Sequence, residues 1–185
     1  MNSMLYPKNS ASRVAMNLSG MWKIKYDFDQ VGDSADWKNG LDSHDYVPVP
    51  SSFNDLYTDK NIREYAGDIW YETELAIPEF WRGQELELRF GSATHRATVY
   101  FNGVEVGSHE GGFMPFTVSV SDQVRWNQKN LIVVKVNNEL NKTTVPVGRT
   151  TPKRELHRVD KSLDTPSAKI QTDRKSTRLN SSHAT

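Results

Sequence analysis

Three consecutive segments decide the fold of this chain: VPVPSSFND (47–55), IREYAGDIWYETELAIPEFWRGQELELRF (62–90) and VYFNGVEVGSHEGGFMPF (99–116). In the second segment, apolar residues recur at every other position over 71–77 and 86–90, a period that places alternate side chains on opposite faces of a β-strand. In the third, Asn102-Gly103 separates two short apolar runs. This pair suits a two-residue hairpin turn because both residues take positive φ. The segments therefore predict antiparallel strands joined by tight turns.

The alternation continues on both sides of these segments. Trp22, Ile24 and Tyr26 share one face of an earlier run, and residues 131–136 form a continuous apolar run, as in strands covered on both faces. No helical period of 3.6 residues persists for three turns. The chain is predicted to be all-β, with two antiparallel sheets packed as a β-sandwich.

Length and composition limit the classes of protein. With 185 residues, the chain can hold one domain with a substantial core, but not a sandwich together with a (β/α)8 barrel, which alone needs about 250 residues. It has no cysteine, which excludes disulfides, thiolate metal sites and a thiol nucleophile. The N-terminal residues lack the apolar core of a signal peptide, and no run approaches the roughly 18 apolar residues of a membrane span. We expect a cytoplasmic protein with no membrane partner.

The three quoted segments resemble, in order, the first domain of the family 2 glycoside hydrolases, and the bacterial β-glucuronidases most closely. The resemblance runs from about residue 18 to about residue 148. It implies a sugar-binding jelly roll of the galactose-binding type, which accompanies a middle domain and a catalytic barrel without carrying the catalytic carboxylates. The parent enzyme would hydrolyse O-glycosyl bonds of glucuronides, and this domain would support the barrel and its pocket. No cofactor is implied.

Pattern and charge divide the chain into four parts. We predict an N-terminal arm (1–17), the jelly roll (18–148), a loop or linker (149–172) and a tail (173–185). The apolar pattern fails after Gly148, where isolated apolar residues cannot offset the chain entropy lost on folding. The resemblance implies a further strand that this sequence lacks, so we expect a sandwich that is incomplete at its C-terminal strand. Residues 173–183, DRKSTRLNSSH, resemble a translated sequencing adapter and predict a non-biological tail; the alternative is a genuine basic tail.

No catalytic carboxylate pair is expected in this chain. A retaining glycosidase needs two carboxylates about 5 to 5.5 Å apart on a rigid frame. The resemblance implies that one of them belongs to an Asn-Glu dipeptide on the barrel. Asn138-Glu139 is such a dipeptide, but its place at the end of a predicted strand makes Glu139 a loop carboxylate. The pairs 72/74 and 85/87 alternate with apolar residues and predict solvated strand faces.

The loop at Ser51–Asp55 is the best candidate for a functional site. Asn and Asp favour turns, so a purely structural corner is the simpler interpretation. The alternative is the edge of a sugar pocket in which an arginine fork binds the carboxylate of a glucuronide. The candidate residues are Asn54 and Asp55 of this loop, together with Arg63 and Tyr65 shortly after it.

Two tryptophans are further candidates for carbohydrate contact. Trp37 and Trp81 lie in polar or turn-like surroundings and are expected to be exposed, as rings that carry a sugar are. Trp22 and Trp70 open apolar strands and are expected to pack in the core or at a sheet edge. The histidines show no metal-ligand spacing, and no metal is predicted.

Three functions are compatible with these patterns. The first is the non-catalytic N-terminal domain of a β-glucuronidase-like hydrolase, which would meet the barrel and middle domain of its parent chain and help to form a homo-oligomer. The second is a free-standing carbohydrate-binding module. The third is a nucleic-acid binder through residues 149–180, but these lack the aromatic residues that stack on bases, so no nucleic-acid partner is expected.

Overall fold

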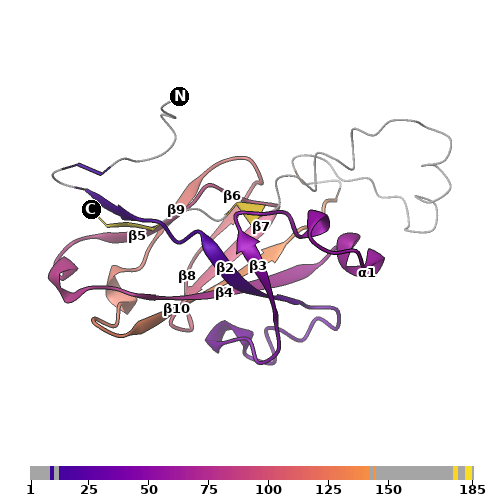
Figure 1. The fold of residues 1–185 in the computed structure, drawn as a ribbon, viewed down its shortest axis with the longest axis horizontal. Helices are drawn as coiled ribbons and strands as arrows, with labels where there is room; N and C mark the ends of the chain where they lie inside the picture. The colour runs from indigo at the N-terminus through magenta and orange to yellow at the C-terminus, as the bar shows by residue number, and fades with distance from the viewer. Residues whose placement is uncertain (1–8, 11–12, 142–143, 145–176, 179–181, 185) are drawn as a thin grey trace.

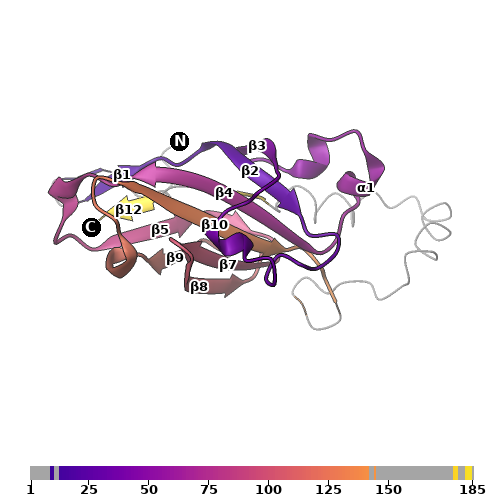
Figure 2. The ribbon, with the colours of Figure 1, turned by 90° about the horizontal axis from the view of Figure 1, so that it is seen from below.

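The computed structural model describes residues 9–10, 13–141, 144, 177–178 and 182–184, and these form a two-sheet sandwich (Figure 1). The larger sheet has six strands in the order β3-β2-β4-β10-β7-β8, which Figure 2 shows side by side. Its strands are β2 (Gly20–Tyr26), β3 (Asp45–Val49), β4 (Asp68–Ala76), β7 (Arg96–Phe101), β8 (Val104–Glu110) and β10 (Lys129–Asn137). All of its pairings are antiparallel, and the predicted all-β sandwich is confirmed.

The smaller sheet has four strands in the order β1-β12-β5-β9. These are β1 (Val14–Met16), β5 (Leu86–Phe90), β9 (Phe116–Ser119) and β12 (Ser182–Ala184); β6 (Ser92–Ala93) pairs separately with β11 (Thr177–Arg178). The short helices are η1 (Trp37–Asn39), η2 (Phe53–Asp55), α1 (Lys60–Arg63), η3 (Glu79–Trp81) and η4 (Ser121–Gln123). Among the described residues, no helix has the length and apolar character needed to cross a membrane.

The main core lies between the two sheets and follows the predicted alternation. Trp22 and Ile24 of β2 are buried in it, as are the inward residues of β5. The predicted hairpin is also confirmed, because Asn102 and Gly103 join β7 to β8 with φ of 52° and 83°. The Asn102 side chain also reaches Asn130, which ties the turn to the start of β10. Alternation and turn chemistry thus set the register of this part of the sandwich.

The six-stranded sheet is covered on its outer face as well. A second cluster of buried residues lies there: Trp37, Leu41, Trp70, Tyr100 and Val133. Two of its members, Trp37 and Leu41, come from the segment between β2 and β3, which folds back over β4 and β10. Strand β10 is therefore covered on both faces, as its apolar run predicted. Strand β4 is covered there too, so the prediction that Glu72 lies on a solvated face was wrong: it is 2% exposed.

Part of the predicted tail pairs with the sandwich. Strand β12 (Ser182–Ala184) lies between β1 and β5 and pairs antiparallel with both. The boundary at residue 173 and the non-biological origin of the tail stay predictions. The predicted linker, 149–172, lies outside the described residues.

Candidate functional site

Four of the six candidate residues gather at one end of the sandwich, in a segment that we name the α1 corner (residues 51–67). It contains η2 and α1 and precedes β4 (Figure 1). Asp59 caps α1, because its side chain accepts a hydrogen bond from the Asn61 amide (2.7 Å). The candidates of this corner are Asn54, Asp55, Arg63 and Tyr65.

Asn54 holds the two helical turns of the corner together. Its Nδ2 donates to the carbonyl of Arg63, and its Oδ1 accepts from the Ser52 hydroxyl (3.1 Å). Both ends of the amide are thereby used within the corner. The simpler interpretation, a structured turn, is therefore the one that the geometry supports for Asn54.

Tyr65 fixes the corner to the sheet. Its hydroxyl lies 2.7 Å from the carbonyl oxygen of Asp27 and 3.1 Å from that of Asp68, and it donates to this pair of acceptors. Its half-buried ring meets Tyr26 and Phe28 edge to face, with centroids 5.5 and 4.8 Å away. Burial, aided by the nearby Asp27 and Asp68 carboxylates, raises the pKa of Tyr65 to about 12. The phenol thus stays protonated at neutral pH.

The remaining two candidates face outward. Arg63 and Asp55 are exposed, and so are the apolar side chains of Phe28 and Leu56 on the same end of the molecule. A guanidinium, a carboxylate and two apolar groups are therefore what the α1 corner offers to a partner. Such a mixture is typical of interfaces between domains.

The Asn-Glu dipeptide has a structural role. Asn138 Nδ2 donates to the carbonyl of Tyr65 (2.9 Å), and its Oδ1 accepts from the Gly67 amide (2.8 Å). Gly67 has φ of 150°, and a Cβ there would lie 2.7 Å from the Tyr65 hydroxyl, so the turn requires glycine. Glu139 is exposed next to these hydrogen bonds of Asn138. The end of β10 and the α1 corner are thus joined.

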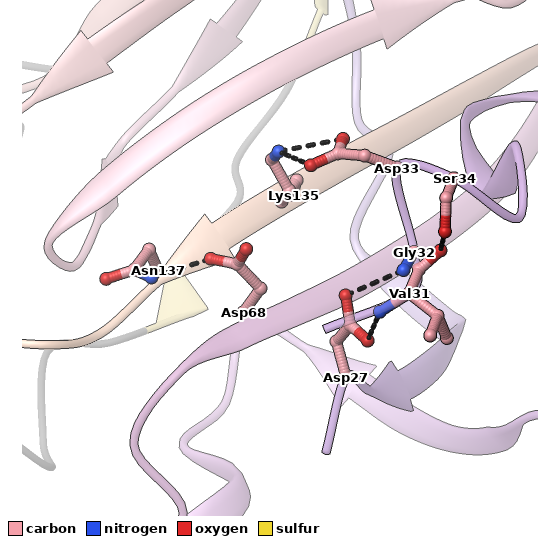
Figure 3. Close-up of polar contacts among 8 residues, drawn as sticks. All are labelled: Asp27, Val31, Gly32, Asp33, Ser34, Asp68, Lys135 and Asn137. Carbon is pink, nitrogen blue, oxygen red and sulfur yellow. Dashed lines mark hydrogen bonds and ion pairs between the residues drawn. The ribbon is translucent and has the colours of Figure 1, made fainter. Parts of the chain in front are cut away.

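Further polar contacts connect the same end of the sheet to the segment after β2, as Figure 3 shows. Buried Asp27 accepts from the amides of Val31 (2.8 Å) and Gly32 (2.9 Å). Lys135 of β10 binds Asp33 (2.7 Å). Burial opposes the charge on Lys135, but the hydrogen bond to Asp33 and the electrostatic attraction of Tyr100, Asp33 and Asp68 together outweigh it and raise the lysine pKa. Asp27 thus holds the backbone at the start of this segment, and Asp33 joins the segment to β10.

A third carboxylate at this end of the sheet, that of Asp68, is also hydrogen-bonded. Asn137 Nδ2 of β10 donates to Oδ1 of Asp68, the first residue of β4 (2.6 Å; Figure 3). Within the described residues, no three His, Asp or Glu side chains form a group that could hold a metal ion.

The expected exposure of Trp37 was wrong. Its side chain is 6% exposed and packs edge to face on Trp70, with ring centroids 5.9 Å apart. Lys25 lies over the indole, with Nζ 3.8 Å from the ring centroid. The polar neighbours of Trp37 face solvent because the segment folds back over the sheet, and the ring fills the second cluster. It offers no platform for a sugar.

Trp81 lies at the opposite end of β4 from the α1 corner. It is half-buried and packs against the main core, while the neighbouring Phe80 is 79% exposed. The exposed ring at this turn is therefore Phe80, which sequence reasoning missed. The single turn of η3 places consecutive residues in different surroundings, and an alternating pattern carries no signal for that.

Comparison with known proteins identifies the family. A family model described as "Glycosyl hydrolases family 2, sugar binding domain" matches residues 15–146. The chain belongs to this family. The resemblance seen in the three segments is thereby confirmed, as is the sandwich fold that it implied.

The relatives are β-glucuronidases, and the chain matches one part of them. The protein from Paenibacillus borealis is 41% identical over 147 residues, which are 79% of this chain and 25% of that protein. The human protein is 37% identical over 164 residues, with 78% of this chain and 24% of that protein covered. A solved structure of Ruminococcus gnavus β-glucuronidase is 39% identical to this chain, with a TM-score of 0.80. The match covers 97% of this chain and 29% of the Ruminococcus gnavus chain. The chain thus spans about a quarter of the length of these curated relatives.

Proposed function

We propose that this family 2 chain serves as the non-catalytic N-terminal domain of a β-glucuronidase-like retaining hydrolase, where it supports the catalytic barrel and the edge of its pocket. The observation that carries the proposal is the match to the sugar binding domain alone, over about a quarter of each curated relative. The engaged carboxylates support it further, since Asp27, Glu72 and Asp68 all bind groups of the sandwich itself.

The α1 corner is the face that we assign to the rest of the parent chain. Strand β10 ends at Asn137, and the Asn138 side chain binds the backbone of this corner directly after it. The end of β10 therefore lies beside the corner. The exposed Phe28 and Leu56 supply apolar area for such a contact, and Arg63 supplies a cation with a planar donor fork.

Arg63 has two roles open to it at this face. It can pair with a carboxylate of the adjoining domain, or it can approach the carboxylate of a glucuronide at the edge of the pocket. Both roles require the corner to lie against the barrel. The same proposal includes a cytoplasmic location and assembly of the parent enzyme into a homo-oligomer. Sedimentation of the parent enzyme measures its oligomeric state and so tests the assembly.

A chimaera tests the proposal. Residues 15–146 would replace the corresponding domain of the Ruminococcus gnavus β-glucuronidase, and kcat and KM would be measured on an aryl glucuronide. We expect the chimaera to turn over, and Arg63→Ala to raise KM or lower the thermal midpoint of the assembled enzyme, with Arg89→Ala on β5 as the control. A folded chimaera that is unaffected by Arg63→Ala would remove the corner from the interface. Turnover by the isolated chain would refute the non-catalytic role.

A further inference from the structure

The turn that joins β8 to β9 (residues 111–115) lies at the same end of the six-stranded sheet as the α1 corner. Strand β4 begins at Asp68, directly after that corner, and Asp68 pairs with Asn137, the last residue of β10. Arg96 of β7 lies opposite Asn137, and Glu110, the last residue of β8, lies opposite Arg96. Three steps between neighbouring strands, each of about 4.8 Å, therefore place the turn roughly 15 Å from the corner.

Backbone hydrogen bonds continue this row beyond the ends of the strands. The His95 amide donates to the carbonyl of Asn137 (2.8 Å), and the Gly111 amide donates to the carbonyl of His95 (2.8 Å). On the other side of β10, the Asn138 amide donates to the carbonyl of Gly67 in the α1 corner (3.3 Å). The corner and the turn are thus connected through one row of backbone bonds.

The turn is packed tightly on its own domain. A Cβ on Gly112 would lie 2.5 Å from the Thr94 hydroxyl oxygen, so the backbone at this point lies directly on that side chain. The rings on either side of the turn, His109 and Phe116, stack with centroids 4.5 Å apart. Phe116 in turn stacks on Phe90 of β5, with centroids 4.8 Å apart. Both ends of the turn are therefore fixed.

Two neighbouring apolar side chains are exposed at the tip of the turn. Phe113 is 45% exposed and Met114 is 66% exposed. The turn reads Gly-Gly-Phe-Met-Pro and includes no charged residue. Phenylalanine and methionine are enriched where protein surfaces meet, and a fixed backbone reduces the entropy lost when such side chains are buried. The turn therefore has the composition of an anchor for an apolar depression in another protein domain.

The position of the turn indicates which domain covers it. An interface of standard size buries about 800 Å² on each partner, which corresponds to a width of roughly 30 Å. A barrel of about 250 residues has a radius of gyration of about 18 Å and is large enough for such a contact. A barrel that rests on the α1 corner therefore also reaches the turn. The more exposed Phe80 lies away from this contact, because it follows the opposite end of β4.

We propose that the β8–β9 turn is a second docking point for the catalytic barrel of the parent chain, at which Phe113 and Met114 enter an apolar depression of the barrel surface. This inference rests on the proposed function and extends it. A single contact at the α1 corner leaves the sandwich free to rotate about that point, whereas two contacts roughly 15 Å apart fix its orientation. The turn thereby holds Arg63 of the corner in place at the edge of the pocket.

Oxidation of exposed methionines tests directly whether the turn is covered. Hydrogen peroxide converts an exposed methionine to its sulfoxide, and mass spectrometry gives the rate at each residue. The 185-residue chain is compared with the Ruminococcus gnavus chimaera described above. Met21, near the start of β2, is 60% exposed and is the matched reference for Met114. We expect Met114 to be oxidised more slowly in the chimaera, by about fivefold or more, and Met21 to be oxidised at the same rate in both.

Substitutions provide an independent measurement. Phe113→Ala and Met114→Ala should each lower the thermal midpoint of the chimaera by about 2 °C or more. Neither should change the midpoint of the 185-residue chain, because both side chains are exposed there. Phe80→Ala is the control: it removes a more exposed ring at the other end of β4 and should change neither midpoint.

Three results would overturn the proposal. The first is equal oxidation of Met114 in the chimaera and in the 185-residue chain, and the second is a chimaera midpoint that neither variant alters. The third is protection of Met114 that appears in the 185-residue chain as its concentration rises, which would make the turn a contact between copies. A chimaera that hydrolyses an aryl glucuronide while Met114 stays unprotected rejects the docking of the turn alone. A folded chimaera without turnover counts against the proposed function itself.

Discussion

Lys23 of β2 and Glu72 of β4 pair across the six-stranded sheet, with Nζ 2.6 Å from Oε1, and the carboxylate is buried beneath the segment that follows β2. The second oxygen, Oε2, accepts from the Leu41 amide. The hydrogen bond to Glu72 raises the pKa of Lys23. One buried carboxylate thus joins two strands and holds the covering segment on the sheet.

Replacement of this carboxylate tests that role. We expect Glu72→Gln to lower the free energy of unfolding by about 2 kcal/mol, because it takes the charge from a buried, doubly bonded group and leaves Lys23 without its partner. Glu74→Gln on the same strand is the matched control: its ion pair with Lys129 is equally short, but both side chains are largely exposed, so the loss should stay below about 1 kcal/mol. Urea denaturation measures both. Equal losses would contradict the assignment.

The raised pKa of Tyr65 predicts that the folded chain loses stability at alkaline pH. Its pKa is raised to about 12 in the folded chain, so the folded state keeps the phenolic proton where the unfolded state, with a pKa near 10, has lost it. This contribution is fully present below about pH 10 and is lost as the pH rises toward 12. The unfolding free energy should therefore fall less steeply with pH in Tyr65→Phe over this range. The difference in slope corresponds to at most one proton. A variant with the wild-type slope would show that Tyr65 is not the titrating group.

Asn138 and Glu139 are expected to differ sharply although they are neighbours. Asn138→Ala removes the bonds to Tyr65 and Gly67 and should cost about 1 to 3 kcal/mol, with exchange of the Gly67 amide at least tenfold faster. Glu139→Gln changes only an exposed side chain and should alter stability by less than about 0.5 kcal/mol. Hydrogen exchange followed by NMR resolves the two. A larger loss of stability from Glu139→Gln than from Asn138→Ala would contradict this assignment, because the exposed carboxylate would then be the stabilising group.

Trp37 is expected to matter for folding and not for sugar binding. Trp37→Ala removes a buried indole from the second cluster and should destabilise the chain by about 3 to 5 kcal/mol. Phe80→Ala, at an exposed ring, should change stability by less than about 0.5 kcal/mol. Thermal unfolding of the two variants distinguishes buried from exposed aromatic roles. Similar midpoints would mean that the segment after β2 does not cover the sheet in solution.

The features that follow from local pattern were predictable from the sequence. Alternation placed Trp22 and Ile24 in the core, and the need for positive φ placed Asn102-Gly103 in a hairpin. Long-range covering was not predictable. Trp37 is buried because its own segment folds over the sheet, and Glu72 is buried because that segment covers its strand; no local pattern records either.

The candidate sites divide in the same way. The Asn54, Arg63 and Tyr65 group was found because the three residues are close in the sequence and share one turn-rich segment. The contact between Asn127 and Glu79 was missed because Asn127 reaches Glu79 from a separate loop 48 residues along the chain. A contact between separate loops leaves no mark on the composition of either loop.

The central claim is that this family 2 domain supports a hydrolase without cleaving a glycoside itself. The most direct measurement is the hydrolysis of 4-nitrophenyl β-D-glucuronide by the purified 185-residue chain, with Glu139→Gln in parallel. For both proteins, we expect nitrophenol to be released no faster than in the absence of protein. Turnover by the wild-type chain that disappears in Glu139→Gln would contradict it.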